Sequence, residues 1–200
     1  SGPISSSQKK LLSNSYQSTQ RIINLISDLL DVARLEEGKL GFRFVEQSFI
    51  PVLEKAAERA SILAEERNVI FTVKIPKDLP NVVFDEDRIL LVLDNLLENA
   101  IKYTKPNKKV WLTVEKKKGS IEVVVKDEGI GVPDGQMRHI FERFFRARNA
   151  QLFETEGTGL GLYTAKNIVE HHKGEMWFES KENKGSVFSF SLPIPNLKKK

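Results

Sequence analysis

Three polar side chains interrupt an otherwise aliphatic segment that runs from Asp85 to Tyr103. Asn95, Asn99 and Lys102 recur at helical spacing, so on an α-helix they fall within roughly a 60° arc. Asparagine is a poor interior helix former and is costly to bury without partners. Its amide oxygen suits Mg²⁺, and a lysine one turn further on can face a phosphate. The pattern indicates a metal-phosphate site; the alternative is the plain solvated face of an amphipathic helix.

A second motif begins with an acidic residue at the end of a strand. Ile121, Val123 and Val125 define one face of this strand, and Asp127 continues the same parity. A carboxylate in a core-facing row needs hydrogen-bond donors, and the exocyclic amine of adenine is one. The glycines of Asp127-Glu-Gly-Ile-Gly131 would let a flat ring approach the backbone closely. The alternative is a turn whose aspartate binds its own backbone.

A third motif, Gly157-Thr-Gly-Leu-Gly161, opens a helix. Glycines at a helix N-terminus expose backbone N–H groups to an anion, and the helix dipole favours negative charge there. The motif is not a Walker loop, because no Gly-Lys-Ser/Thr follows, and its glycine spacing differs from that of a dinucleotide fingerprint. It therefore indicates a phosphate-binding loop or, alternatively, a flexible loop without a ligand.

The segment between the last two motifs combines aromatic and basic residues. Phe141-Glu-Arg-Phe-Phe-Arg146 places three phenylalanines on a short helix, with arginines three residues apart. The stretch 148–156 that follows is mostly polar. We interpret the two as an aromatic hinge and a mobile lid over a nucleotide, with Arg146 reaching a terminal phosphate. A surface helix with ordinary arginines is the alternative.

These motifs need a framework of helices and strands. Hydrophobic periodicity and turn signals predict strands at 40–45, 69–75, 82–84, 110–116, 121–127, 175–180 and 186–193, and helices at 48–67 (capped by Ser48), 85–103, 134–145 and 160–172. Helices and strands do not alternate regularly. The order therefore predicts an α/β fold in which one layer of helices covers one mixed sheet.

The first 37 residues or so differ from the rest. Apolar side chains recur at alternating spacings of four and three from Leu12 to Ala33, and the pattern ends near Glu37-Gly38. This predicts a long helix with a seam for other helices, although it could instead pack only on its own domain.

Composition excludes several classes of protein. The 200 residues carry 31 basic and 27 acidic side chains, a formal net charge of +4 to which Lys198, Lys199 and Lys200 contribute most, so charge alone is weak evidence for nucleic-acid binding. The absence of cysteine excludes a disulfide framework, thiolate zinc and a cysteine nucleophile. No apolar run approaches 18 residues, and no signal peptide is visible.

Taken together, the motifs resemble the boxes of the catalytic and ATP-binding domain of bacterial sensor histidine kinases. The N box is similar to Asp94-Asn-Leu-Leu-Glu-Asn-Ala-Ile-Lys-Tyr-Thr104, and the F box to the segment 141–146. The two glycine boxes match the segments 127–131 and 157–161, and the last box matches Lys184-Gly-Ser-Val-Phe188. The resemblance covers the whole chain after a short N-terminal stretch.

This resemblance implies a Bergerat-type two-layer sandwich that binds ATP with Mg²⁺ and transfers the γ-phosphoryl group to a histidine on a dimerisation bundle. It makes Asn99 the Mg²⁺ ligand and places Asn95 where related ATPases keep a catalytic glutamate. The implied catalytic residues are Asn95, Asn99, Lys102 (facing phosphate) and Arg146 (approaching the γ-phosphate). The implied nucleotide-binding residues are Asn95, Asn99, Lys102, Tyr103 (flanking adenine), Asp127 (accepting from its amino group), Gly129, Gly131, Gly157, Thr158, Gly159, Leu160, Gly161 and Ser186.

The resemblance also implies a domain organisation. We expect 1–8 to be a vector scar (Ser1-Gly2-Pro3) or disordered, 9–38 to be the second bundle helix, 39–195 the catalytic domain and 196–200 a tail. The family's phospho-accepting His-Glu-x-x-Arg-Thr-Pro-Leu segment does not occur here, where the histidines are His139, His171 and His172. We therefore expect that the first bundle helix has been removed and that this fragment alone does not autophosphorylate.

The expected partners follow from the same resemblance. They are a second copy through the N-terminal helix, a response-regulator receiver domain and the histidine-bearing bundle helix of the parent protein. We expect no nucleic acid, a cytoplasmic location, and membrane contact only through segments of the parent.

Two other functions stay open at this point. One is a non-catalytic ATP-binding and dimerisation module that signals through conformation. The other is a different ATPase of the same clan, gyrase-like or chaperone-like, although asparagine rather than glutamate at position 95 argues against activation of water.

Overall fold

The computed structural model describes residues 4–36, 41–154 and 157–195. The chain divides into two units, of which the first ends at Gly41 and the second begins at Phe42. The predicted N-terminal scar (1–3), the helix stop at Glu37-Gly38 and the tail (196–200) lie outside the described residues.

The first unit is a single helix, α1 (Ser6–Glu36). It begins with a capping box: Ser5 Oγ accepts the Gln8 N–H at 3.2 Å, and Gln8 Oε1 accepts the Ser5 N–H at 2.8 Å. The helix exposes large apolar side chains along its length: Leu11, Leu12, Tyr16, Ile22, Ile23, Leu25, Ile26, Leu29 and Leu30. A long helix with an apolar seam is thus what the structure contains.

The second unit is built on a mixed five-stranded sheet. Its strands, in spatial order, are β2 (Ile70–Lys74), β4 (Lys109–Lys117), β5 (Ser120–Asp127), β7 (Gly185–Pro193) and β6 (Met176–Lys181). The β2–β4 pair is parallel and the other pairs are antiparallel. Two short strands, β1 (Val45–Gln47) and β3 (Val82–Phe84), form a separate antiparallel pair.

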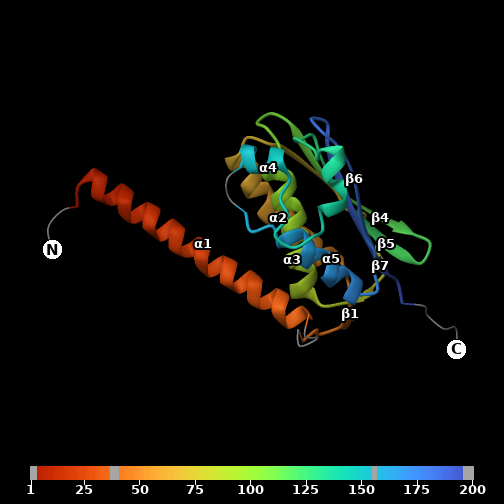
Figure 1. The fold of residues 1–200 in the computed structure, drawn as a ribbon. Helices are drawn as coiled ribbons and strands as arrows, with labels where there is room; N and C mark the ends of the chain where they lie inside the picture. Colours follow the sequence, from red (N-terminus) through yellow and green to blue (C-terminus); the bar gives the residue numbers. More distant parts are fainter. Residues whose placement is uncertain (1–3, 37–40, 155–156, 196–200) are drawn as a thin grey trace, which may run out of the picture. The chain divides into compact units, whose positions relative to one another are not determined.

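Three helices lie on one face of this sheet: α2 (Ile50–Glu66), α3 (Glu86–Lys102) and α5 (Gly161–His171), as Figure 1 shows. Two short helices, η1 (Asp134–His139) and α4 (Arg148–Phe153), lie in the connection from β5 to α5. The predicted two-layer sandwich of helices on a mixed sheet is confirmed.

The hydrophobic core lies between these two layers. From α3 it contains Ile89, Leu93, Leu96, Leu97 and Ile101, and from the sheet Val110, Leu112, Ile121, Val123, Val125, Phe190 and Leu192. Along β4 and β5 every second residue is buried, because alternate side chains point to opposite faces of a strand. The core therefore fixes the register of the strand that ends at Asp127.

Helix α3 has strong signals at both ends. Asp85 is its N-cap and accepts the Arg88 N–H at 3.1 Å, and two acidic residues occupy the first turn, where the helix dipole favours negative charge. Lys102 stands in the last turn, and the Tyr103 N–H closes the helix on Asn99 O at 3.0 Å. These signals explain why the predicted range 85–103 agrees with the structure.

Two predictions near the start of the second unit are wrong in detail. The strand expected at 40–45 is β1, which begins only at Val45. The helix expected at 48–67 begins at Ile50 with Phe49 as N-cap, and no side chain caps it. Ser48 Oγ instead accepts the Ile50 N–H at 3.4 Å. Pro51 in the first turn has no N–H, so this helix start has fewer donors to satisfy.

The hinge and lid also differ from expectation. The helix predicted at 134–145 is a 3₁₀ helix that ends at His139, and Phe144 has φ 61°, which a right-handed helix cannot include. The first part of the segment 148–156 forms a short helix, α4, for which no helix was predicted, and its role as a mobile lid stays a prediction. Of that segment, 155–156 lie outside the described residues.

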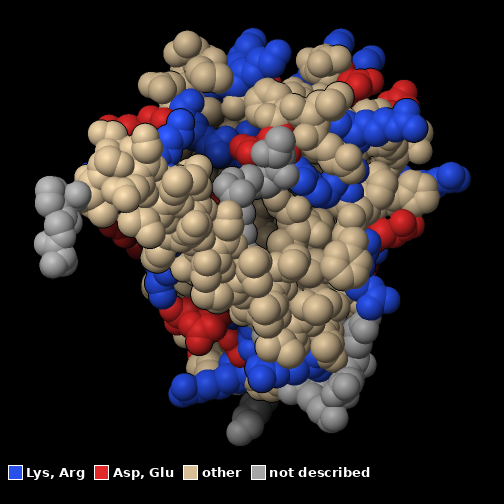
Figure 2. Space-filling view, turned by 60° about the vertical axis from the view of Figure 1, so that its left-hand side comes forward, with Lys and Arg blue, Asp and Glu red and all other residues tan. Residues whose placement is uncertain are grey.

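The surface shows no separation of charge on the face drawn in Figure 2, where Lys and Arg side chains lie among Asp and Glu side chains. Among the described residues, no helix has the length and apolar character that a membrane span requires.

Candidate functional site

Asn95 connects the middle of α3 to the start of α5. Its side chain is half-buried, and its Nδ2 donates to Leu91 O at 2.9 Å. Its Oδ1 lies against Gly161, where a Cβ atom would come within 2.2 Å of that oxygen. The first residue of α5 therefore has to be glycine for the two helices to approach this closely.

Asn99 and Lys102 follow on the same face of α3. Asn99 is half-buried, and its side-chain amide has no hydrogen-bond partner within the described residues. Lys102 Nζ lies 5.9 Å from the centroid of the Tyr103 ring, and this ring lies 6.5 Å from that of Phe153 in α4. An amide and an ammonium group are thus placed together beside an aromatic pair.

Asp127 is the buried acid of the site, with 6% of its surface exposed. Its Oδ1 accepts two backbone hydrogen bonds, from Gly129 N–H at 2.8 Å and from Ser186 N–H at 3.2 Å. Oδ2 accepts from no described residue and stays available to a donor from a ligand. Burial raises the pKa of Asp127 to about 6, against the two backbone hydrogen bonds, which favour the ionised form.

The glycines around Asp127 allow close packing of backbone on backbone. A Cβ on Gly129 would lie 2.5 Å from Tyr103 O and 2.6 Å from Asp127 Oδ1. Gly131 (φ 61°) packs on Lys181 O, and Gly185 (φ 97°) on Asp127 O. The sequence left open whether the Asp127 carboxylate accepts from the backbone of its own turn or from an adenine ring. In the structure Oδ1 accepts from the Gly129 N–H of that turn, and Oδ2 has no donor among the described residues. At Gly131 the nearest neighbour of the Cβ position is Lys181 O, and the approach of a flat ring to this backbone stays a prediction.

One further polar atom near this turn is unsatisfied. Thr104 Oγ1 is fully buried and has no hydrogen-bond partner within the described residues. It would lie 3.1 Å from a Cβ on Gly129, so it belongs to the same small region as Asp127. Thr104 ends the predicted N box, but the sequence did not indicate that its hydroxyl is buried without a partner among the described residues.

The glycine segment before α5 packs on the hinge and on α3. Gly159 (φ 72°) lies against the backbone of Phe144 and Phe145, which leaves no space for a side chain. Thr158 Oγ1 accepts the Leu160 N–H at 3.2 Å, and Leu160 is fully buried. A buried anchor therefore fixes the N-terminus of α5 next to α3.

Arg146 lies beside this glycine segment. Its guanidinium donates to Glu154 O and, at 3.4 Å, to Gly157 O, and it contacts the Cα region of Gly157. It thus links the two sides of the segment 154–157. Its contact with a terminal phosphate stays a prediction.

Contacts between α4 and the rest of the site were missed by sequence reasoning. Asn149 Nδ2 donates to Gly131 O at 2.8 Å, and Glu154 Oε2 lies 3.3 Å from Arg67 Nη2 at the end of α2. Arg67 Nη1 also donates to Lys102 O at 3.4 Å. These residues belong to no motif, so only the structure brings them to the site.

His172 is a structural residue. Its Nδ1 donates to Ile168 O at 2.7 Å and its Nε2 accepts the Asp85 N–H at 3.0 Å, which fixes one neutral tautomer. Burial lowers its pKa, because desolvation disfavours the charged ring. Both ring nitrogens are therefore engaged in hydrogen bonds with the backbone.

The described side chains do not form a complete metal site of their own, but they suit a metal that is bound mainly by phosphate oxygens. Within the described ranges, no three His, Asp or Glu side chains gather into a metal site. Mg²⁺ is commonly held by one or two protein oxygens, with phosphates and water completing its shell. The free amide of Asn99 can supply one such oxygen.

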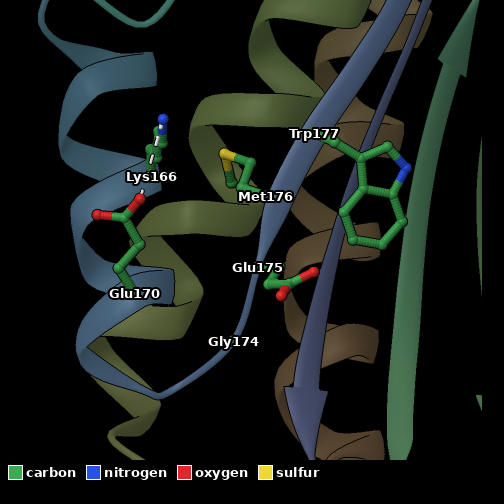
Figure 3. Close-up of a pocket in the computed structure, with 6 residues that line it drawn as sticks. All are labelled: Lys166, Glu170, Gly174, Glu175, Met176 and Trp177. Atoms are coloured by element: carbon green, nitrogen blue, oxygen red, sulfur yellow. Dashed lines mark ion pairs between the residues drawn. The ribbon is translucent and has the colours of Figure 1, made fainter.

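A separate groove lies between α5 and the start of β6 (Figure 3). It is lined by Lys166, Glu170, Gly174, Glu175, Met176 and Trp177. Lys166 and Glu170 form an ion pair at 3.9 Å. None of the predicted site residues lines this groove.

Comparison with known proteins adds independent information. Residues 84–196 match the family described as histidine kinase-, DNA gyrase B-, and HSP90-like ATPase. The adaptive-response sensory kinase SasA of Synechococcus sp. (strain JA-3-3Ab) is 33% identical over 191 residues, which are 95% of this chain and 50% of that protein. The sensor histidine kinase WalK of Bacillus subtilis (strain 168) is 33% identical over 177 residues, 88% of this chain and 29% of that one. The chain thus spans half or less of these curated relatives.

Solved structures agree with these matches. The catalytic domain of histidine kinase ThkA has a TM-score of 0.66 and 32% identity, covering 76% of this chain and 96% of that domain. Full-length ShkA in complex with AMPPNP has a TM-score of 0.81 and 25% identity, covering 96% of this chain and 40% of that one. ThkA in complex with the response regulator protein TrrA has a TM-score of 0.74 at 24% identity over 99% of this chain and 55% of that one, a likeness of fold.

Proposed function

Because the chain belongs to the histidine kinase-, DNA gyrase B- and HSP90-like ATPase family, as the ATP-binding catalytic domain of a sensor histidine kinase, we propose that it transfers the γ-phosphoryl group of ATP to a histidine on a bundle helix. One observation carries the proposal. Gly161 contacts Asn95 in the middle of α3, and Gly129 and Ile130 contact the Tyr103 carbonyl at the C-cap of the same helix. Both glycine segments therefore meet the same helix.

The nucleotide would lie along this face. Asp127 Oδ2 accepts from the exocyclic amine of the purine, and Tyr103 flanks the ring. The triphosphate runs toward the N-terminus of α5, whose dipole and N–H groups favour an anion. Lys102 adds a positive charge on the way, and Arg146 approaches the γ-phosphate.

Magnesium would enter with the nucleotide. Asn99 supplies its protein oxygen, and the ion, when bound, offsets charge on the phosphates. The other site residues act by positioning the γ-phosphate for the acceptor histidine, because the site has no nucleophile of its own. A ring nitrogen of the acceptor histidine uses its lone pair to form the new N–P bond. The bond from the γ-phosphorus to the bridging oxygen breaks, and its electron pair leaves with ADP.

Residues 9–38 would contribute to dimerisation. We propose that α1 pairs with a second copy and with the histidine-bearing helix of the parent protein, because an exposed apolar seam of this length is typical of a helix–helix interface. A receiver domain of a response regulator would then take the phosphoryl group from the histidine. We propose no nucleic-acid partner for this chain.

The test uses this chain mixed with the histidine-bearing bundle of the same parent, Mg²⁺ and γ-labelled ATP. We expect acid-labile phosphate on the bundle. Its absence, with ATP binding intact, favours the non-catalytic binding module. Steady ATP hydrolysis without transfer favours another ATPase of the clan. Asn99→Ala is the matched loss-of-function variant, because it removes the only metal ligand assigned here while leaving the core unchanged.

A further inference from the structure

The Ser180 hydroxyl lies where β6, β7 and the loop after β5 meet. Its Oγ accepts the Val132 N–H at 2.8 Å and lies 3.1 Å from Gly185 O and 3.0 Å from Ser186 Oγ. Ser180 is half-buried. One side chain thus contacts two segments that are far apart in the sequence.

The three contacts of Ser180 fix the direction of its hydrogen bonds. A hydroxyl donates one hydrogen and accepts at two lone pairs. One lone pair is taken by Val132 N–H, and Gly185 O can only accept. The hydrogen of Ser180 therefore goes to Gly185 O, and the Ser186 hydroxyl donates to Ser180. Ser186 Oγ is left with lone pairs only, as an acceptor.

One of the two segments held by Ser180 contacts Asp127 directly, and the other continues from the turn that begins at Asp127. On one side, Ser186 N–H donates to Asp127 Oδ1, and Gly185 packs on Asp127 O. On the other side, Val132 follows Gly131, whose Cα packs on Lys181 O. Asn183 N–H donates to Ile130 O at 2.7 Å and closes the same junction. Among the described side chains, Ser180 and Asp127 itself both bond to the loop after β5 and to β7.

We infer that Ser180 is a positioning residue of the nucleotide site, which holds the Ser186 amide on Asp127 and orients Ser186 Oγ as a second acceptor for the base. This inference rests on the proposed function. Ser180 belongs to none of the recognised motifs and does not itself touch the nucleotide. Its loss would leave the Val132 N–H without its partner and remove the side-chain link between Val132 and Gly185, so that the neighbouring Ser186 N–H is held on Asp127 less firmly.

The chain offers a matched control in Ser191. Its Oγ accepts the Glu175 N–H at 3.3 Å across the same two strands, at the opposite end of the hairpin. Ser191→Ala therefore removes a comparable hydrogen bond without touching Asp127. Ser180→Thr keeps the hydroxyl. Ser180→Val places a side chain of the same shape as threonine at this position, with a methyl group instead of the hydroxyl.

The experiment measures the Kd for ADP by calorimetry together with the unfolding temperature. We expect Ser180→Ala and Ser180→Val to weaken binding about tenfold, a change that corresponds to one buried hydrogen bond. Ser180→Thr restores most of the affinity, and Ser191→Ala leaves it unchanged. The midpoint of the pH dependence of binding moves upward in Ser180→Val, because Asp127 loses a donor that favours its ionised form.

Three results would overturn the inference: wild-type affinity in Ser180→Val, equal weakening by Ser191→Ala, or an unchanged pH midpoint. If Ser180→Ala does not fold, the Thr and Val variants still decide the question, because they differ only by the hydroxyl. If the wild-type chain binds no ADP, the proposed function fails instead.

Discussion

Asn95 Oδ1 lies directly against the Cα of Gly161, so that the middle of α3 and the first residue of α5 are in contact. The amide nitrogen of Asn95 is held by Leu91 O one turn earlier, which fixes the direction of the oxygen. Two motifs that are 66 positions apart in the sequence thereby form one surface. This contact brings the expected phosphate loop against the helix that bears the expected metal ligand, Asn99.

Replacing Gly161 with alanine should disrupt this surface. The new Cβ would meet Asn95 Oδ1 at 2.2 Å, so either Asn95 or the start of α5 has to move. We expect nucleotide affinity to fall at least tenfold, with a modest loss of stability of about 1–3 kcal/mol. Gly135→Ala is the control, because nothing lies within 4 Å of its Cβ position. Equal affinities of the two variants in calorimetry would contradict the prediction.

Asp127→Asn should weaken nucleotide binding. The substitution replaces a charge-assisted hydrogen bond to the base, and we expect a loss of roughly 1.5–3 kcal/mol in binding free energy. Calorimetric titration with ADP measures it. An unchanged affinity would show that the base does not bind at Asp127.

The same substitution should stabilise the free protein at neutral pH. The folded-state pKa of Asp127 is raised from 3.8 to about 6 by burial, so the folded state holds the proton more tightly than the unfolded state. Ionisation therefore costs stability, and this cost develops as pH rises from about 4 to 6. We expect Asp127→Asn to gain on the order of 2–3 kcal/mol above pH 6 and nothing below pH 4. Thermal unfolding across this range, without nucleotide, is the measurement.

His172 should make the folded state sensitive to acid in the opposite sense. Burial lowers its pKa below 6.5, so the unfolded state binds the proton more tightly, and stability falls as pH drops below 6.5. A protonated ring also cannot accept the Asp85 N–H. His172→Gln, which keeps a neutral donor and acceptor, should flatten this part of the stability profile. His171→Gln, at an exposed position, should not; the reverse pattern would contradict the prediction.

Arg146→Ala tests whether this arginine reaches the γ-phosphate. If it does, the variant loses affinity for ATP while its affinity for ADP changes little, and phosphotransfer to the bundle falls. The guanidinium also links Glu154 O and Gly157 O, and that role alone would weaken both nucleotides equally. Parallel calorimetric titrations with ADP and a non-hydrolysable ATP analogue distinguish the two.

The sequence was sufficient for the elements that carry strong local signals. Helix α3 has an acidic N-cap and a nearly continuous apolar face, so both of its ends were predicted within a residue. The parity of β5 placed Asp127 on the buried face, because the two-residue period of a strand is unambiguous. Helix α2 was less well predicted, because Ser48 looks like a cap while Phe49 occupies that position.

Contacts between distant segments could not be predicted in this way. Arg67 and Glu154 lie 87 residues apart and belong to no motif, yet they form an ion pair beside α3. Gly131 and Gly185 belong to recognised boxes, but the sequence did not indicate that Gly131 packs on Lys181 O and Gly185 on Asp127 O. Such contacts depend on the tertiary arrangement, about which local patterns carry no information.

The packing of Gly131 on Lys181 O and of Gly185 on Asp127 O has a consequence for inhibitor chemistry. In the proposed binding mode, the floor beneath the purine is made of peptide groups, which are the same in every protein, and no side chain can be introduced there without a clash. A competitive compound gains little discrimination between kinases by reaching toward this floor. Substituents directed at the side chains of α4, such as Asn149 and Phe153, offer the better route to selectivity.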